Sequence, residues 1–220
     1  MSGTSQAATL FDLCGGHPAL DLVNSLDNRF RSDGPHERLA SYGDLLRFLE
    51  ESRLLSRERV RLLNQAVPPE AAERTLQSAR ELREATAALF YGTLAGDPPH
   101  AADVRVLEKH FHDASQHREL RWQAAQLEAS GNAARSHDRA ALAWQWGRYE
   151  AEPDLPLWVI AHEVSDLLLS DEMARVRTCA VDTCRWLFLD TSKNHTRRWC
   201  NMKVCGNRMK ARRFQARRED

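Results

Sequence analysis

The chain has 220 residues, of which 42% are hydrophobic and 28% are charged, and its formal net charge is zero. This composition is typical of a globular protein, and the length is enough for one domain with its own core plus a small module. There is no apolar run of about 18 residues and no basic start followed by an apolar stretch, which argues against a membrane span and a secretory signal, so we expect a cytoplasmic protein.

The zero net charge hides an uneven distribution. Residues 175–220 contain 13 Lys and Arg against 4 Asp and Glu, a net charge of +9, which leaves −9 for the rest of the chain. Such asymmetry indicates a basic end that seeks a polyanion and an acidic body that carries it.

Apolar periodicity predicts a mainly helical body. One helix follows Ser41 as N-cap, a second runs to Pro68, and a long one spans 70–94 and stops at Gly96. Further helices are expected over 101–114 and over 155–168, where Pro156 is tolerated in the first turn. Residues 120–146 carry a Ser-Gly-Asn turn signal and short apolar clusters, which predict strands or a hairpin.

Four of the five cysteines follow the pattern C-x4-C-x15-C-x4-C, at Cys179, Cys184, Cys200 and Cys205. Two close pairs suit tetrahedral zinc, because two turns of the chain each supply two thiolates while the segment between them folds back. We expect "RWLFLDTSKN" to form that hairpin and its apolar residues to make a small core beside the metal. The sequence thus predicts one structural Zn²⁺ per chain.

Other interpretations of these cysteines remain open. They include reduced thiols or a redox pair, a catalytic metal that keeps an open position, and His195 as a ligand in place of a cysteine. The fifth cysteine, Cys14, is expected to be a free structural thiol.

The terminal segment, with "RWLFLDTS", "RRWC" and the literal tetrad Cys205-Gly206-Asn207-Arg208, resembles the CGNR zinc-finger family. The N-terminal "GGHPALDLVNSL" is similar to the opening motif of the ABATE domain, which commonly precedes this finger in bacterial proteins. The resemblance implies a stress-induced transcriptional regulator with a zinc-dependent DNA-binding end.

The tetrad also has a physical interpretation. Gly206 permits a left-handed or crowded backbone after a metal ligand, Asn207 can hydrogen-bond locally, and Arg208 opens a basic helical run. This run is either a solvated helix end or a helix that contacts nucleic acid, since clustered Lys and Arg displace counterions from phosphates. The candidate nucleic-acid-binding residues are Lys193, Arg197, Arg198, Arg208, Lys210, Arg212, Arg213, Arg217 and Arg218.

Within "GHPALDLVNSL", His17, Asp21 and Asn24 recur at helical spacings of four and three. On a helix they project together, either toward a pocket for a small-molecule effector or as polar groups that brace neighbouring elements. Neither a complete zincin motif nor a nucleophile elbow, P-loop or dinucleotide fingerprint is present, so we expect no enzymatic activity.

Together these features predict an α+β protein with a mainly helical ABATE-like body, residues 1–174, and a small zinc-binding module, residues 175–220. We expect a transcriptional regulator that binds DNA through the four-cysteine finger. One alternative is a zinc-stabilised adaptor that binds RNA or another protein, with the basic tail neutralising an acidic partner or the acidic body itself. Another is an enzyme in which His17, Asp21 and Asn24 line a catalytic pocket.

Overall fold

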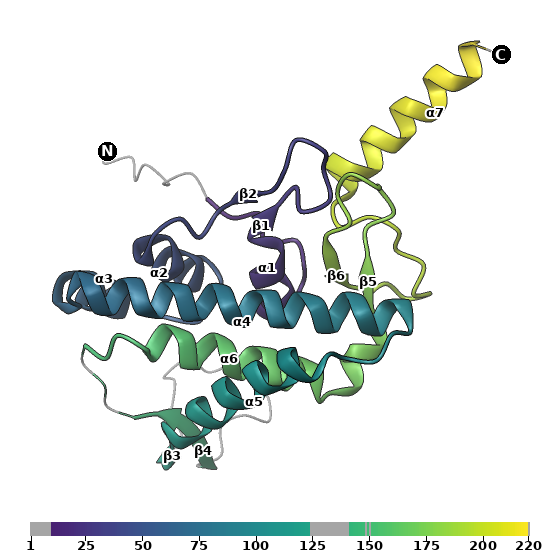
Figure 1. Ribbon diagram of the computed structural model, residues 1–220. Coiled ribbons are helices and arrows are strands. Elements are labelled where there is room, and N and C mark those ends of the chain that lie inside the picture. Colours follow the sequence, from purple (N-terminus) through teal and green to yellow (C-terminus); the bar gives the residue numbers. More distant parts are fainter. Residues whose placement is uncertain (1–9, 124–140, 148, 150, 220) are drawn as a thin grey trace, which may run out of the picture.

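The computed structural model describes residues 10–123, 141–147, 149 and 151–219, with the backbone alone at 123, 141, 213 and 216–219. Most of the described chain is helical, and its strands form three separate antiparallel pairs (Figure 1). An α+β fold with a mainly helical body is therefore confirmed. No helix among the described residues is long and apolar enough to cross a membrane.

The body consists of six α-helices and two of the strand pairs. The helices are α1 (Pro18–Asn24), α2 (Tyr42–Glu51), α3 (Arg57–Ala66), α4 (Pro69–Ala95), α5 (Ala101–Gln116) and α6 (Leu155–Leu168). The first short pair is β1 (Leu26–Asp27) with β2 (His36–Glu37), and the second is β3 (Arg118–Gln123) with β4 (Ala141–Trp146). Helix α6 packs against α1, α4 and α5, which places it at the centre of the body.

Local sequence signals set the helix ends. Ser41 caps α2 in a capping box with Asp44, and Gly96 ends α4 with a left-handed φ of 82°. Pro156 lies in the first turn of α6, where no intrahelical N–H bond is lost. The predicted body helices and the predicted hairpin are confirmed, while the Ser-Gly-Asn turn signal lies outside the described residues.

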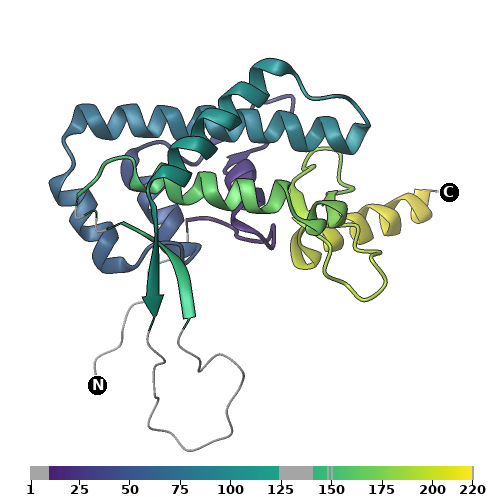
Figure 2. The same ribbon diagram turned by 90° about the horizontal axis from the view of Figure 1, so that it is seen from below.

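The terminal module contains one strand pair and two helical segments. A 3₁₀ turn, η1 (Asp171–Arg175), leads from α6 into β5 (Val176–Thr178), which pairs with β6 (Leu187–Leu189). A single π-helical turn, η2 (Met202–Gly206), then precedes the last helix, α7 (Asn207–Glu219). In Figures 1 and 2, α7 projects away from the body, at the opposite end from the β3–β4 hairpin.

The hairpin of the module differs from the sequence prediction. The stretch "RWLFLD" supplies only its second strand, because β6 pairs with β5, and both Cys179 and Cys184 lie in the connection between them. Leu187 and Leu189 belong to the core of the body, whereas Phe188 packs in the cysteine cluster. A strand alternates its side chains between two faces, so β6 joins the two cores.

His110 on α5 is a buried polar group without a partner. It is 2% exposed, and neither ring nitrogen has a hydrogen bond in the described structure. Burial lowers the pKa of His110, because the charged imidazolium would lose its hydration. The unfolded state therefore binds a proton more readily than the folded state. As the pH falls below the pKa that His110 has in the unfolded chain, the free energy of unfolding decreases.

We predict that His110→Leu reduces the loss of stability on acidification. Between pH 7.5 and pH 5.5, the free energy of unfolding of the variant should fall by on the order of 1 kcal/mol less than that of the wild type. The control is His112→Leu, an exposed position on the same helix. Denaturant unfolding at the two pH values measures both, and an identical pH dependence of wild type and His110→Leu would contradict the prediction.

Candidate metal centre and its contact with the body

The four predicted ligands meet at one point. Their Sγ atoms all lie within 4.8 Å of one another, with Cys184 to Cys200 at 3.6 Å and Cys200 to Cys205 at 3.7 Å. A tetrahedral Zn–S distance of about 2.3 Å requires an S–S distance of about 3.8 Å. The cluster thus has the donor set and the dimensions of a closed structural zinc site, and the residues fit one zinc ion.

Local structure places each of these cysteines. Cys179 follows β5 directly, and its N–H donates to the carbonyl of Trp186 at 2.8 Å. The N–H of Cys184 donates to Val181 O at 2.8 Å in a tight turn, and the N–H of Cys205 donates to Asn201 O at 2.9 Å within η2. Backbone hydrogen bonds therefore hold three of the ligands in position.

The electrostatics of the cluster favour a cation. Hydrogen bonds from the thiols of Cys184 and Cys200 lower the pKa of Cys179, whereas the hydrogen bond with Cys179 raises the pKa of Cys184. Hydrogen bonds with Cys14, Cys179 and Cys184 raise the pKa of Cys200. Thiols this close together cannot all become thiolates unless a positive ion compensates their charge. A bound divalent metal would release the remaining protons and make metal affinity depend on pH.

Cys14 is a fifth sulfur beside the cluster. It is half-buried, packs against the cluster residues, and its thiol interacts with that of Cys200. It does not belong to the group of four that shares the short sulfur distances. This position agrees with a structural thiol that is not a ligand.

After the ligand Cys205, the three other residues of the CGNR tetrad differ in their surroundings. Gly206 is crowded, because a Cβ there would overlap the Met202 side chain, but its φ is not positive, so the left-handed alternative does not apply. The amide of Asn207 donates to Lys203 O at 3.0 Å and so caps η2. Arg208 follows as an exposed residue in the first turn of α7.

A single side chain of helix α1 makes two hydrogen bonds to the backbone of β6. The Asn24 amide donates to Leu187 O and its Oδ1 accepts from Leu187 N–H, both at 2.9 Å. On the same strand, the N–H of Leu189 donates to Gly15 O at 2.7 Å. Both backbone groups of Leu187 and the N–H of Leu189 are thereby satisfied by the N-terminal motif, so the finger is docked on the body.

The Arg197 side chain has several contacts within the protein. The sequence predicts it as a phosphate contact, and in the structure its guanidinium donates to the carbonyls of Trp199, Cys14 and Cys200 and lies 4.5 Å above the Phe188 ring. A guanidinium in this position links the finger to the N-terminal segment and has few donors left for a ligand. Its contact with a phosphate stays a prediction.

The three candidate effector residues also have structural contacts. Nδ1 of His17 caps α1 by accepting from Ala19 N–H at 3.2 Å, and Asp21 accepts from Gly15 N–H at 2.7 Å. Asp21 is 7% exposed, and burial raises the pKa of its carboxyl to about 7. All three side chains therefore brace the region around α1.

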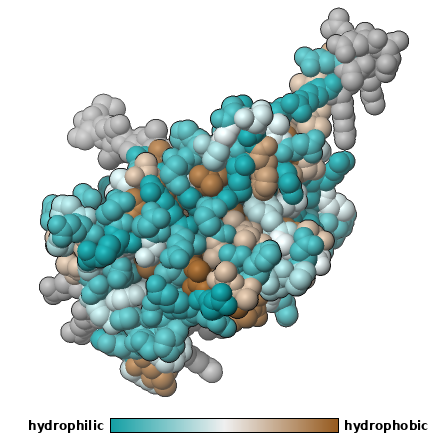
Figure 3. All heavy atoms as spheres, in the orientation of Figure 1, coloured by the Kyte–Doolittle hydropathy of each residue, from teal (hydrophilic) through white to brown (hydrophobic). Residues whose placement is uncertain are grey.

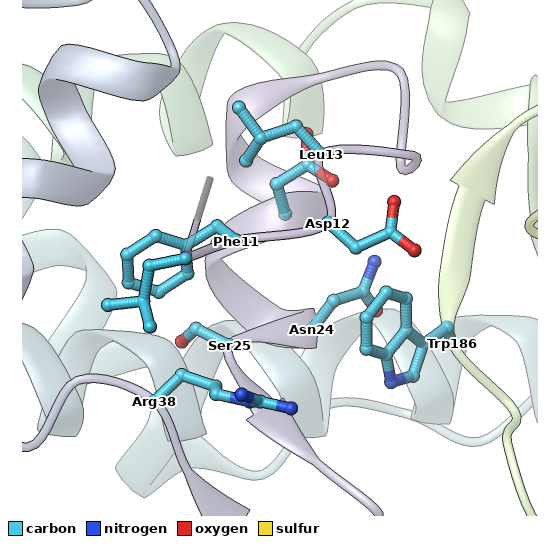
Figure 4. Close-up of a pocket in the computed structure, with 9 residues that line it drawn as sticks. Phe11, Asp12, Leu13, Asn24, Ser25, Arg38 and Trp186 are labelled. Carbon is cyan, nitrogen blue, oxygen red and sulfur yellow. The ribbon is translucent and has the colours of Figure 1, made fainter. Parts of the chain in front are cut away.

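Asp21 and Asn24 line a cavity between the N-terminal segment and Trp186, which Figure 4 shows with Arg38 at its edge. His17 does not line it. The cavity measures about 80 Å³, whereas pockets for drug-sized ligands hold about 300–1,000 Å³. A space of this size suits water molecules better than an organic effector, and effector binding stays a prediction.

The other predicted nucleic-acid-binding residues lie at the surface wherever their side chains are described. The exposed ones are Lys193, Arg198, Arg208, Lys210 and Arg212. The side chains of Arg213, Arg217 and Arg218 lie outside the described set. Lys203 on η2 is also exposed and was missed by the sequence prediction, although its position two residues before a ligand could have indicated it.

Family models match both parts of the chain. Residues 16–171 match the ABATE model, whose description is "Putative stress-induced transcription regulator". The chain belongs to the ABATE family. Residues 175–218 match the CGNR zinc finger. A search of curated proteins gives no match. The ABATE match begins at Gly16, so the α1 residues that dock the finger lie at the start of the ABATE domain.

We predict that Cys205→Ser loses the zinc and that Cys14→Ser retains one zinc per chain. The physical reason is that only the former removes one of the four equivalent donors, and structural zinc contributes on the order of 10 kcal/mol gross to folding. Elemental analysis of protein purified without chelator measures the metal content. Absence of zinc from the wild type, or its loss from Cys14→Ser alone, would contradict the proposed ligand set.

We predict that Asn24→Ala destabilises the chain by about 2–4 kcal/mol, because it leaves the buried N–H and C=O of Leu187 without partners. Asn64→Ala, an exposed position on α3, is the control and should change the free energy of unfolding by less than ~0.5 kcal/mol. Denaturant unfolding followed by circular dichroism compares the two. Equal stability of both variants would show that the finger docks by other contacts.

Proposed function

We propose that this ABATE-family protein is a transcriptional regulator that binds DNA through its CGNR finger, acts in the cytoplasm and has no enzymatic activity. The observation that carries the proposal is the geometry of α7. This basic helix starts two residues after the metal ligand Cys205 and projects away from the acidic body (Figure 1).

The exposed residues of α7 have the chemistry that duplex DNA requires. Arg208, Lys210 and Arg212 are all exposed within the first two turns. Lys and Arg on a helix neutralise phosphates and release counterions, and an α-helix fits the major groove. Arg208 and Arg212, four residues apart on one face, are our candidates for bidentate contacts with guanine.

The metal would fix the position of this helix. Gly206 packs under Met202, and the Asn207 amide caps η2, so the start of α7 is tied to the turn that presents Cys205. Loss of zinc would release this turn and with it the orientation of α7. The proposal therefore expects DNA affinity to require bound zinc.

In the adaptor alternative, the zinc finger binds RNA or another protein in place of duplex DNA. A basic helix also attracts RNA or an acidic protein, since the electrostatic attraction carries no sequence information. Neutralisation of the acidic body by its own tail finds no support, because α7 points away from the body in Figures 1 and 2. Duplex DNA remains the partner that best fits an isolated, projecting helix.

We predict that DNA affinity falls with salt and that Arg208→Ala, Lys210→Ala and Arg212→Ala each reduce the slope of log affinity against log salt by about one. Arg105→Ala on α5, exposed but in the body, is the matched control and should leave the slope unchanged. A base-reading arginine should in addition cost about 1–3 kcal/mol on the preferred site and less on random DNA.

Titrations at several salt concentrations with duplex DNA, duplex RNA and zinc-depleted protein measure these effects. Salt-independent binding, tighter binding to RNA than to DNA, or full affinity without zinc would contradict the proposed function.

A further inference from the structure

Among the described residues, no element covers one apolar face of the β3–β4 hairpin. In its register, Leu120 lies opposite Trp144 and Trp122 opposite Leu142. Residues two apart on a strand share a face, and directly paired residues of an antiparallel ladder lie on the same side. These four side chains, here called the hairpin face, therefore lie together, and each is 53–65% exposed.

The two faces of the hairpin differ sharply. Glu119 and Arg121 form an ion pair on the other side of β3. At the root of the hairpin, Arg118 lies over the rings of Trp144 and Trp146, and Trp146 packs against the body core. The hairpin is thus anchored at one end, and Figure 3 shows hydrophobic side chains gathered where β3 and β4 lie in Figure 1.

Exposed apolar area on this scale needs an explanation. The exposed fractions correspond to ~500 Å² of mostly carbon surface, which is near the upper end of the largest patch on ordinary monomers. An isolated two-stranded hairpin is at best marginally stable in water, and a sheet must bury its apolar face against another layer. The other large exposed hydrophobic residues among those described lie outside this hairpin.

We propose that the hairpin face is a self-association surface, on which the hairpin of a second copy of this chain packs. A two-fold axis between the two hairpins brings the same apolar patch against itself, which needs no complementary patch elsewhere on the molecule. None of the four side chains carries a charge that would repel its equivalent.

The area supports a reversible dimer. Two copies would bury about 1,000 Å² in total, which lies at the lower limit of specific interfaces and is typical of weak, concentration-dependent assembly. Because α7 and the hairpin lie at opposite ends of the body, both fingers would remain free in such a dimer (Figure 1). This proposal does not depend on DNA as the partner of α7.

The test is sedimentation equilibrium of the full zinc-bound chain from about 1 to 100 µM, the range in which an interface of ~1,000 Å² is expected to dissociate. The wild type should show a monomer–dimer equilibrium. Trp122→Glu should weaken association at least tenfold, because it places a charge within the buried face. Arg121→Ala, on the opposite face of the same strand, is the control and should associate as the wild type does.

Circular dichroism and zinc content should be the same in all three proteins, since Trp122 is exposed. A wild type that stays monomeric over the whole range would overturn the proposal, and so would a dimer whose dissociation constant is unchanged in Trp122→Glu. If the monomer instead floats with phosphatidylcholine vesicles and Trp122→Glu does not, the face binds lipid and the proposal is wrong.

Discussion

The structure depends on the pairing of the Asn24 amide with both backbone groups of Leu187. These residues are 163 positions apart, and the contact is buried. A strand of three residues paired to another of three has little stability of its own. On its side away from β5, β6 gains further hydrogen bonds from Gly15 and from Asn24 of α1. The finger therefore contributes residues to the core of the body, and the body supplies hydrogen-bond partners to the finger.

Because of this contact, the body and the finger are not structurally independent domains. The ABATE match ends at residue 171 and the CGNR match begins at residue 175. The cores do not divide there, because Val176, Leu187 and Leu189 lie in the body cluster. Removing the chain from residue 175 onward would expose apolar surface on α1 and remove both partners of the Asn24 amide, so an isolated body is expected to be much less stable than the full chain.

A second consequence concerns the metal. Zinc would hold Cys179 and Cys184 together within the β5–β6 connection, and Arg197 ties Cys200 to Cys14 of the N-terminal segment. The metal centre is thus connected to the N-terminal region by two short routes. One runs through strand β6 to Asn24 of α1, and the other runs through the Arg197 guanidinium to Cys14. The basic helix lies on the far side of the same centre, so one ion links the docking surface to the proposed DNA-binding surface.

The sequence predicts features whose cause is local. The N-cap at Ser41, the stop at Gly96 and the two equal cysteine spacings depend on residues close together in the chain, and all are found. The role of Arg197 could not be predicted, because an arginine beside another arginine and a tryptophan is equally compatible with a phosphate contact. Its acceptors include Cys14 O, 183 positions away. Asn24 gave a partial signal as a polar residue at the end of an apolar helix, but nothing local indicates Leu187 as its partner.

The most direct test of this account is amide hydrogen exchange in α1 before and after zinc is removed with a chelator. If the finger and the body are one cooperative unit, the amides of Leu20, Leu22 and Val23 should lose protection by at least about tenfold when the metal leaves, because β6 is released with it. Unchanged protection in α1, with loss confined to residues 176–206, would show that the metal stabilises only the finger and would contradict the account.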